Sequence, residues 1–131
     1  MFLDASAIIA ILAGEDDAAS LAGRLSQART AHTSVIAIHE AAVGLARIGN
    51  TSPENTLALV EAFLAEIKAT VAGIDQETGR LALAAFNRVG KGRHAAALNM
   101  GDCFAYACAR QLDVPLLCKG NDFPRTDIAL A

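Results

Sequence analysis

Four acidic residues in this sequence occupy positions that suit the binding of a metal ion: Asp4, Glu40, Asp102 and Asp122. Asp4 follows the apolar pair Phe2–Leu3, and Asp122 lies in a turn after the apolar run 115–118. Both acids therefore come after the carboxyl end of an expected strand. In open α/β sheets ligands bind beyond these strand ends, so acids that are distant in the sequence converge there.

The other two acids, Asp102 and Glu40, lie on expected helices. Asp102 follows Gly101 at the start of a helix, where free N–H groups and the helix dipole stabilise an ionised carboxylate. Glu40 interrupts a largely apolar stretch that runs from Ile36 to Val43. An acid within such a stretch is costly unless it is paired, exposed to water or bound to a metal ion.

Each acid also has an ordinary structural interpretation. Asp4 and Asp102 would serve as helix caps, Asp122 as a turn residue, and Glu40 as a solvated charge on the outer face of its helix. Taken together, three acids at the ends of elements and a fourth within an apolar helix favour a shared site. Carboxylates gathered in one place need a cation to remain ionised. We therefore expect a metal ion among them.

The donor atoms indicate which metal this would be. Carboxylate oxygens select Mg²⁺ or Mn²⁺, whereas zinc sites use His and Cys at regular spacings. His32, His39 and His94 form no such pattern, and the residues after His39 and Glu40 exclude the H-E-x-x-H motif. The segment 90–92, Gly-Lys-Gly, has neither the spacing nor the Ser or Thr of a phosphate-binding P-loop. A nucleotide-binding cradle is therefore not indicated.

Short apolar runs alternate with amphipathic segments along the chain, and this alternation predicts an α/β fold. Capping residues place helix starts at Asp4, Ser34, Ser52–Pro53, Asp75 and Gly101–Asp102. The acidic residues 15–17 are interpreted as the solvated first turn of a further short helix. Strands are expected at 2–3, 30–33, 71–74 and 115–118, with a closing strand at 128–130. Helices between such strands imply a largely parallel sheet covered on both faces.

Composition restricts the class of protein. A chain of 131 residues, 53% of them apolar, is long enough for one folded domain, which we place at 1–131. No apolar run approaches the roughly 20 residues of a membrane span. Met1 leads into Phe2 without a basic leader, so we expect a cytoplasmic protein with no membrane partner. Cys103, Cys108 and Cys118 lack C-x-x-C spacing and are expected to be reduced.

Four segments carry a pattern that extends beyond the acids. They are Phe2-Leu3-Asp4-Ala5-Ser6-Ala7, the stretch from Ser34 to Glu40, the stretch from Leu98 to Tyr106, and Lys119-Gly120-Asn121-Asp122-Phe123. Together they resemble the motifs of PIN-domain ribonucleases, specifically the VapC toxins of toxin–antitoxin pairs, in the same order and at suitable separations over essentially the whole chain. The resemblance implies a PIN-like three-layer α/β/α fold with a short, mainly parallel central sheet.

The resemblance also implies a function. A toxin of this kind is a Mg²⁺- or Mn²⁺-dependent endoribonuclease, and its cleavage of RNA blocks translation. By position, Asp4, Glu40 and Asp102 match the family's three catalytic, metal-binding acids, and Asp122 matches a fourth. Many relatives carry another acid in this last turn, where this chain has Asn121. The amide of Asn121 would offer a ligand oxygen with less charge, so the number of metal ions, one or two, stays open.

Binding of RNA needs cations on a protein whose formal charge is −3. We expect a local basic rim near the acids, although the same residues would also serve as ordinary solvated loop charges. The candidates for contact with RNA are the basic residues Arg88, Lys91, Arg93, His94 and Lys119, together with Ser6 and Asn121. Ser6 would alternatively hydrogen-bond a ligand carboxylate or cap a helix.

The resemblance further implies two protein partners. One is a second copy of the chain in a homodimer, and the other is a small antitoxin that lies across the groove and places a basic side chain among the acids. The Ala-rich helices between Ser34 and Ala69 would offer an apolar face for docking, or would use these residues in the core.

Two other classes of protein compete with a ribonuclease. The first is another metal-dependent phosphohydrolase, such as a phosphatase with an aspartyl nucleophile after the first strand. Such an enzyme usually carries a second acid two positions on, where this chain has Ser6. The second is a non-catalytic binding module that kept the fold, which would not need Asp4, Glu40 and Asp102 together.

Overall fold

Helices and short strands alternate throughout the protein in a computed structural model that describes all 131 residues. The strands are β1 (Phe2–Leu3), β2 (His32–Ser34), β3 (Thr70–Ala72) and β4 (Leu116–Leu117). The helices are α1 (Ala5–Ala13), α2 (Ala18–Ser26), α3 (Val35–Gly49), α4 (Pro53–Glu66), α5 (Gln76–Val89) and α6 (Met100–Gln111), followed by a 3-10 turn, η1 (Phe123–Arg125). The predicted α/β class is confirmed.

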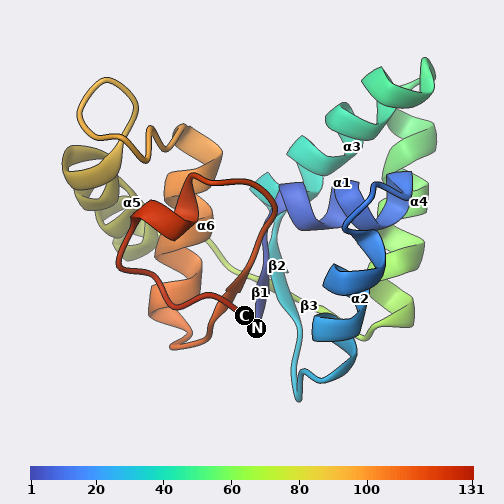
Figure 1. Cartoon of the computed structure of the whole chain (residues 1–131), viewed down its shortest axis with the longest axis horizontal. Helices are drawn as coiled ribbons and strands as arrows, with labels where there is room; N and C mark the ends of the chain where they lie inside the picture. The colour runs from blue at the N-terminus through green and yellow to red at the C-terminus, as the bar shows by residue number, and fades with distance from the viewer.

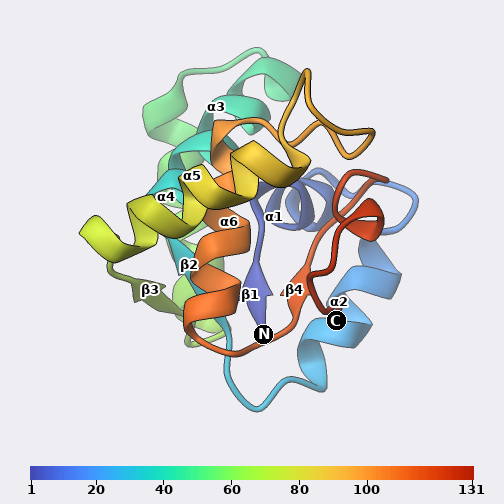
Figure 2. The same ribbon diagram turned by 90° about the vertical axis from the view of Figure 1, so that its left-hand side faces the viewer.

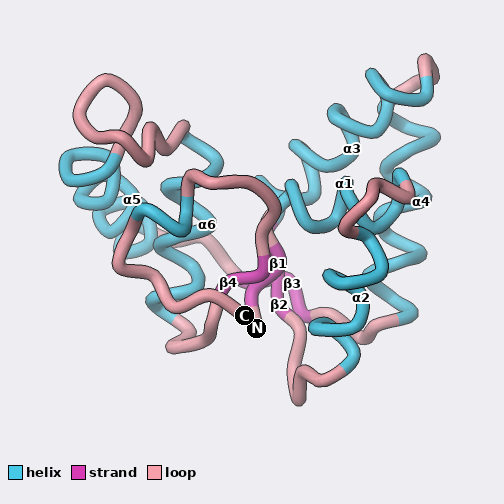
Figure 3. Tube along the Cα trace, viewed as in Figure 1, coloured by secondary structure: helices cyan, strands magenta, loops and turns pink.

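The four strands form one parallel sheet in the order β3-β2-β1-β4 (Figure 3). Phe2 of β1 is in register with His32 of β2 and with Leu116 of β4. From β1 the chain moves outward to β2 and β3, and it then returns to the other side of β1 to form β4. The strand order therefore reverses between β1 and β4, which is where open α/β sheets bind ligands.

Helices cover both faces of this sheet, so the fold has the three layers that the sequence predicts (Figure 1, Figure 2). Helices α1 to α4 lie on one face, and α5 and α6 lie on the other. Two separate cores form because successive strand residues point to opposite faces. Phe2 and Leu116 belong to the core beneath α5 and α6. Leu3 and Leu117 belong to the core beneath α1 to α4.

Side chains at the helix starts explain most of the boundaries. Ser34, Ser52 and Asp75 each accept a backbone N–H in the first turn of α3, α4 and α5, as predicted. Helix α6 has its N-cap at Asn99, before the predicted Gly101–Asp102 start. Asn99 and Asp102 form a capping box, in which each side chain accepts the backbone N–H of the other.

The predicted closing strand at 128–130 is wrong. Leu130 forms only an isolated bridge to Leu116 of β4. The preceding Asp127 accepts a hydrogen bond from Tyr106 of α6 and forms ion pairs with Arg88 of α5 and Arg110 of α6. These contacts hold Asp127 against the two helices, and the chain then reaches β4 only at the bridge of Leu130. Smaller differences are that β2, β3 and β4 each begin or end one or two residues away from the predicted bounds 30–33, 71–74 and 115–118, and that η1 was not predicted.

The acidic residues before α2 are not simply solvated, which corrects their interpretation. Lys119, just after β4, forms ion pairs with Glu15 and Asp17. Asp17 stands at the N-cap position of α2, yet its side chain caps no N–H. The loop between α1 and α2 is therefore tied to the segment that follows β4.

Two expectations from composition can be compared with the structure. No helix combines the length and the apolar composition that crossing a membrane requires. The three cysteines are free thiols, as expected: Cys103 and Cys108 are buried, and Cys118 is half-buried. Burial raises the pKa of Cys103 and of Cys108 to about 11 and that of Cys118 to about 12. All three thiols are therefore protonated at neutral pH, and protonated thiols are poor nucleophiles.

Candidate active site

Asp4 lies at the carboxyl end of β1, beside the point where the strand order reverses. Its side chain caps α1 by accepting the N–H of Ser6 at 2.9 Å, and it also accepts the Ser6 hydroxyl. Only 4% of Asp4 is exposed. Burial raises the pKa of Asp4, and the hydrogen bonds from Ser6 offset part of that rise. Asp4 is therefore a helix cap, as one interpretation has it, and also a buried carboxyl at the ligand-binding edge of the sheet.

Ser6 connects the two strands on either side of the switch point. Its hydroxyl oxygen accepts the backbone N–H of Lys119 at 3.0 Å, while its proton is donated to Asp4. One hydroxyl group thus joins the end of β1 to the segment after β4. Both roles expected of Ser6 are present in part: its backbone N–H takes part in the helix cap, and its hydroxyl orients a candidate ligand carboxyl.

Asp102 lies in the first turn of α6, on the other face of the sheet. Its carboxylate accepts the N–H of Asn99 at 2.8 Å, and its own N–H donates to the Asn99 side chain at 3.0 Å. The pKa of Asp102 is raised to about 6, mainly by burial and further by the like charges of Asp4 and Asp122, although the Asn99 N–H works in the opposite direction. Asp102 is therefore close enough to both acids to respond to their charges.

Glu40 lies near the middle of α3 and faces the other acids. The pKa of Glu40 is raised to about 7, first by partial burial and then by the like charges of Asp4 and Asp102. The interpretation of Glu40 as a solvated charge on the outer face of its helix is therefore wrong. Three acids from β1, α3 and α6 meet at one place, although 98 positions separate Asp4 from Asp102.

A glycine makes the approach of Glu40 to α6 possible. A Cβ added at Gly101 would lie 2.1 Å from Oε2 of Glu40 and 2.3 Å from Oε1. No side chain fits at position 101 while the carboxylate of Glu40 keeps its place. Gly101 was predicted only as part of a helix start, and its packing against α3 is a contact that local sequence patterns do not reveal.

The final turn contributes the more exposed members of the group. Asp122 stands at the N-cap position of η1 without capping it through its side chain, and its charge raises the pKa of Asp102. No such influence of Asp122 reaches Glu40. Asn121 is exposed. The structure thus brings Asp4, Glu40 and Asp102 together and leaves Asp122 at the edge of this group.

The donor chemistry of the group fits a hard divalent cation. The three central side chains offer only carboxylate oxygens. The charges of Asp4 and Asp102 raise the pKa of Glu40, and that of Asp4 raises the pKa of Asp102, a repulsion that a cation would relieve. As they stand, no three His, Cys, Asp or Glu side chains are close enough to chelate one ion. Asp4 and Asp102 are each hydrogen-bonded within their own helix start, to Ser6 and Asn99. Chelation would therefore involve rotation of these side chains.

Comparison with known proteins decides the family. Residues 1–129 match the PIN domain. The chain belongs to the PIN-domain family. A VapC ribonuclease of Rhizobium meliloti (strain 1021) is 39% identical, over 97% of this chain and 98% of its own. A ribonuclease VapC of Mycolicibacterium smegmatis is 35% identical over 98% of each chain. A VapC ribonuclease of Mycobacterium tuberculosis is 40% identical over the whole of this chain and 97% of its own. The resemblance inferred from the motifs is confirmed.

Most basic residues expected around the acids of this PIN domain contact the protein itself. Lys119 forms ion pairs with two acids before α2, and Arg88 forms one with Asp127 at 2.9 Å. The guanidinium of Arg93 lies over an aromatic ring, 5.4 Å from its centroid, and Nδ1 of His94 accepts a backbone N–H. Lys119 and Arg88 would have to give up ion pairs before they could bind RNA.

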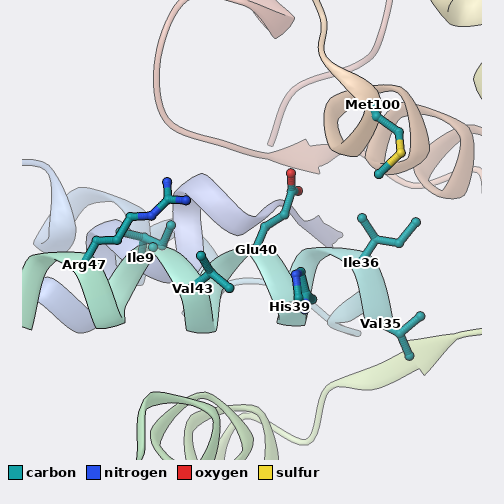
Figure 4. A pocket seen from close by; sticks show the side chains of 9 residues that line it. Ile9, Val35, Ile36, His39, Glu40, Val43, Arg47 and Met100 are labelled. Atoms are coloured by element: carbon teal, nitrogen blue, oxygen red, sulfur yellow. The ribbon is translucent and has the colours of Figure 1, made fainter. Parts of the chain in front are cut away.

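A pocket of about 610 Å³ extends from Glu40 along α3 of the PIN domain, and Arg47 lines it as well (Figure 4). The sequence analysis missed Arg47. Its spacing of seven residues from Glu40 is the signal that would have found it, because residues two helical turns apart lie on the same face of a helix.

Proposed function

We propose that this PIN domain is a Mg²⁺- or Mn²⁺-dependent endoribonuclease and the toxin of a toxin–antitoxin pair. The observation that carries the proposal is the meeting of Asp4, Glu40 and Asp102 in a chain whose relatives are named VapC ribonucleases. Asp122 joins them as a fourth acid because its charge reaches Asp102.

The acids divide the chemistry of RNA hydrolysis among them. When bound, Mg²⁺ or Mn²⁺ would supply the positive charge and Lewis acidity that attack of water on a phosphodiester requires. Asp4 and Asp102 would hold the ion, with their carboxyls presented from fixed helix starts. Glu40 lies against Gly101, beside Asp102, so its carboxylate would be placed to help hold the ion or to take a proton from the attacking water. Ser6 orients the carboxyl of Asp4 through its hydroxyl.

The proposed function includes partners. RNA is the substrate, and its cleavage by the free toxin would block translation. An antitoxin would prevent this by laying a segment across the site, where a basic side chain would neutralise the clustered acids. Helices α3 and α4 carry exposed apolar side chains at Ile48 and Leu59, and these support docking of a second copy or of an antitoxin on this side of the molecule.

The test is cleavage of RNA by the purified protein with Mg²⁺, with Mn²⁺ or with a chelator. We expect cleavage with either metal, none with chelator, and a loss of at least about a hundredfold in Asp102→Asn. Asp113→Asn is the matched control, because Asp113 is an exposed acid beyond the far end of α6 and its φ of 53° suits Asn.

Equal cleavage by the wild type and Asp102→Asn would overturn the proposed function, as would cleavage that survives complete chelation. Trapping of a phosphoaspartate at Asp4 would assign the site to a phosphatase instead.

A further inference from the structure

The pocket that begins at Glu40 contains an unpaired guanidinium. Arg47 lies in the last turn of α3, is exposed, and is the one basic Lys or Arg side chain that lines the pocket. It takes part in none of the ion pairs of the protein. Lys119, which also lies near the acids, is held between Glu15 and Asp17. Arg47 is therefore free to bind an anion beside the acid site.

Ile9 of α1 lies in the pocket between Glu40 and Arg47. Positions 40, 44 and 47 lie on one face of α3, and the middle one is a glycine. A Cβ at Gly44 would lie 2.6 Å from Cδ1 of Ile9, so the Ile9 side chain occupies the space beside this glycine. Figure 4 shows Glu40 and Arg47 projecting to the same side of the helix, with Ile9 beside Arg47 and Val43 between Arg47 and Glu40. The pocket side chains between the acid and the guanidinium, Ile9 and Val43, are apolar.

Most of the wall of this pocket is apolar. Ile9 of α1, Val35, Ile36 and Val43 of α3, and Met100 of α6 line the pocket together with His39, Glu40, Gly44 and Arg47. We refer to this lined surface as the α3 groove. An apolar wall next to charged ends is suited to a molecule that alternates flat apolar groups with anionic ones.

We propose that the α3 groove binds the RNA strand next to the phosphate that is cleaved, with Arg47 on a neighbouring phosphate and a base against the apolar wall. This inference rests on the proposed function. Two helical turns place the residues about 10 Å apart along the axis of α3, so Arg47 would engage a different phosphate from the one held at Glu40. A guanidinium donates two parallel hydrogen bonds to a phosphate, which a lysine does not.

The charges of the α3 groove favour RNA over a protein segment. With a cation among the acids, the groove offers two sites for anions along one helix face, at Glu40 and at Arg47. A polyanionic strand complements both sites. A protein segment would need a basic group at the first site and an acidic group at the second. The overall charge of −3 opposes RNA, so a local guanidinium has a larger effect here than on a basic protein.

The test compares Arg47→Gln with Arg29→Gln, both in the Asp102→Asn protein so that the RNA is not cleaved. Arg29 is exposed, forms no ion pair and precedes β2, at the amino ends of the strands. The Arg29→Gln variant therefore removes the same charge away from the groove. We expect Arg47→Gln to weaken binding of a single-stranded RNA about tenfold and to reduce the salt slope by about 0.7. Arg47→Lys should keep the slope and recover only part of the affinity.

A second measurement locates the RNA without using activity. The chain has two methionines: Met100 lines the α3 groove, and Met1 lines a different pocket with Arg29. In protein labelled with ¹³C at the methionine methyl groups, RNA should shift the NMR signal of Met100 and leave that of Met1 in place.

The outcomes separate this inference from the function on which it rests. A wild-type protein that cleaves no RNA with either metal would overturn both. Wild-type cleavage, combined with equal RNA affinities for Arg47→Gln and Arg29→Gln and a stationary Met100 signal, would overturn the inference alone. If Arg47→Gln leaves the RNA affinity unchanged but weakens binding of a cognate antitoxin, the groove belongs to the protein partner. That result would also overturn the inference.

Discussion

The carboxylate of Glu40 packs directly against the backbone of Gly101, so tightly that a Cβ at position 101 would lie 2.1 Å from Oε2. Glu40 comes from α3 and Gly101 from α6, on opposite faces of the sheet. The contact holds the Glu40 carboxylate beside Asp102, the next residue along α6. Gly101 thus contributes to the site because the absence of a side chain leaves space for the Glu40 carboxylate.

Gly101→Ala should therefore impair the site and spare the fold. The added methyl group would push aside the flexible end of Glu40, and a displacement of about 1 Å can reduce turnover about a hundredfold. Thermal stability should change little, because alanine favours the helix that the glycine disfavours. The measurement is RNA cleavage alongside thermal unfolding. Gly23→Ala is the control, since a Cβ at this helical position meets no atom within 4 Å. Cleavage by Gly101→Ala at the wild-type rate would show that the position of Glu40 does not matter.

The stability of the metal-free protein should fall as pH rises toward neutrality. Glu40 has a folded-state pKa of about 7 against an ordinary 4.5, so the folded state binds more protons than the unfolded chain between these values. Its contribution to stability is complete below about pH 4.5 and is lost as the pH rises through 7. Asp102 acts in the same direction between 3.8 and about 6.

The measurement is the melting temperature as a function of pH for the wild type and Glu40→Gln. Their difference isolates Glu40 from other groups, including His32, whose pKa is lowered by burial. Mg²⁺ or Mn²⁺ should raise the melting temperature of the wild type more above pH 7 than near pH 5, because ligand carboxylates must be ionised. Parallel curves for the two proteins would contradict the raised pKa.

Ser6→Ala should weaken both the fold and the site. It removes the hydroxyl that donates to Asp4, and it leaves the backbone N–H of Lys119 without its acceptor. The expected loss is about 1 to 2 kcal/mol in the free energy of unfolding, together with weaker binding of Mn²⁺. Ser6→Thr keeps the hydroxyl and should restore both quantities. If Ser6→Thr restores stability but not the binding of Mn²⁺, the hydroxyl does not act on the metal site.

Asp127→Asn should reduce stability by about 1 kcal/mol without changing RNA cleavage. The ion pairs with Arg88 and Arg110 are about half exposed, so solvent limits their contribution. The Tyr106 hydroxyl and the nearby Arg88 guanidinium lower the pKa of Asp127 to about 2. The contribution of Asp127 is present above about pH 3.8 and is lost as the pH falls toward 2, so the two proteins should converge in acid. A stability difference that persists at the lowest pH would point to packing instead of charge.

Features that depend on neighbours in the sequence could be predicted, and those that depend on distant partners could not. The caps at Ser34, Ser52 and Asp75 act within one helical turn, so their residue types are sufficient. The path of 128–130 depends on ion pairs between Asp127 and two helices. The ion pair of Lys119 depends on Glu15, which lies 104 residues earlier in the sequence.

The candidate site divides in the same way. Asp4 and Asp102 could be predicted from the ends of elements, and Glu40 from its apolar surroundings, because each stands out against its own segment. The role of Gly101 arises only when α3 packs against α6. By its sequence position, Arg47 is an ordinary basic residue in the last turn of a helix. Its proposed role in binding RNA follows only from the pocket that it shares with Glu40.

The division of the interior into two cores has a mechanical consequence. Only strands of two or three residues separate the cores, and the acids come from both sides, Glu40 with one core and Asp102 with the other. An ion held among the acids would therefore add a cross-link between the two halves, next to the contact of Glu40 with Gly101. Binding of the ion would slow the local unfolding of α3 and of α6 together. Hydrogen exchange and proteolysis of the two halves would therefore respond to metal as one unit.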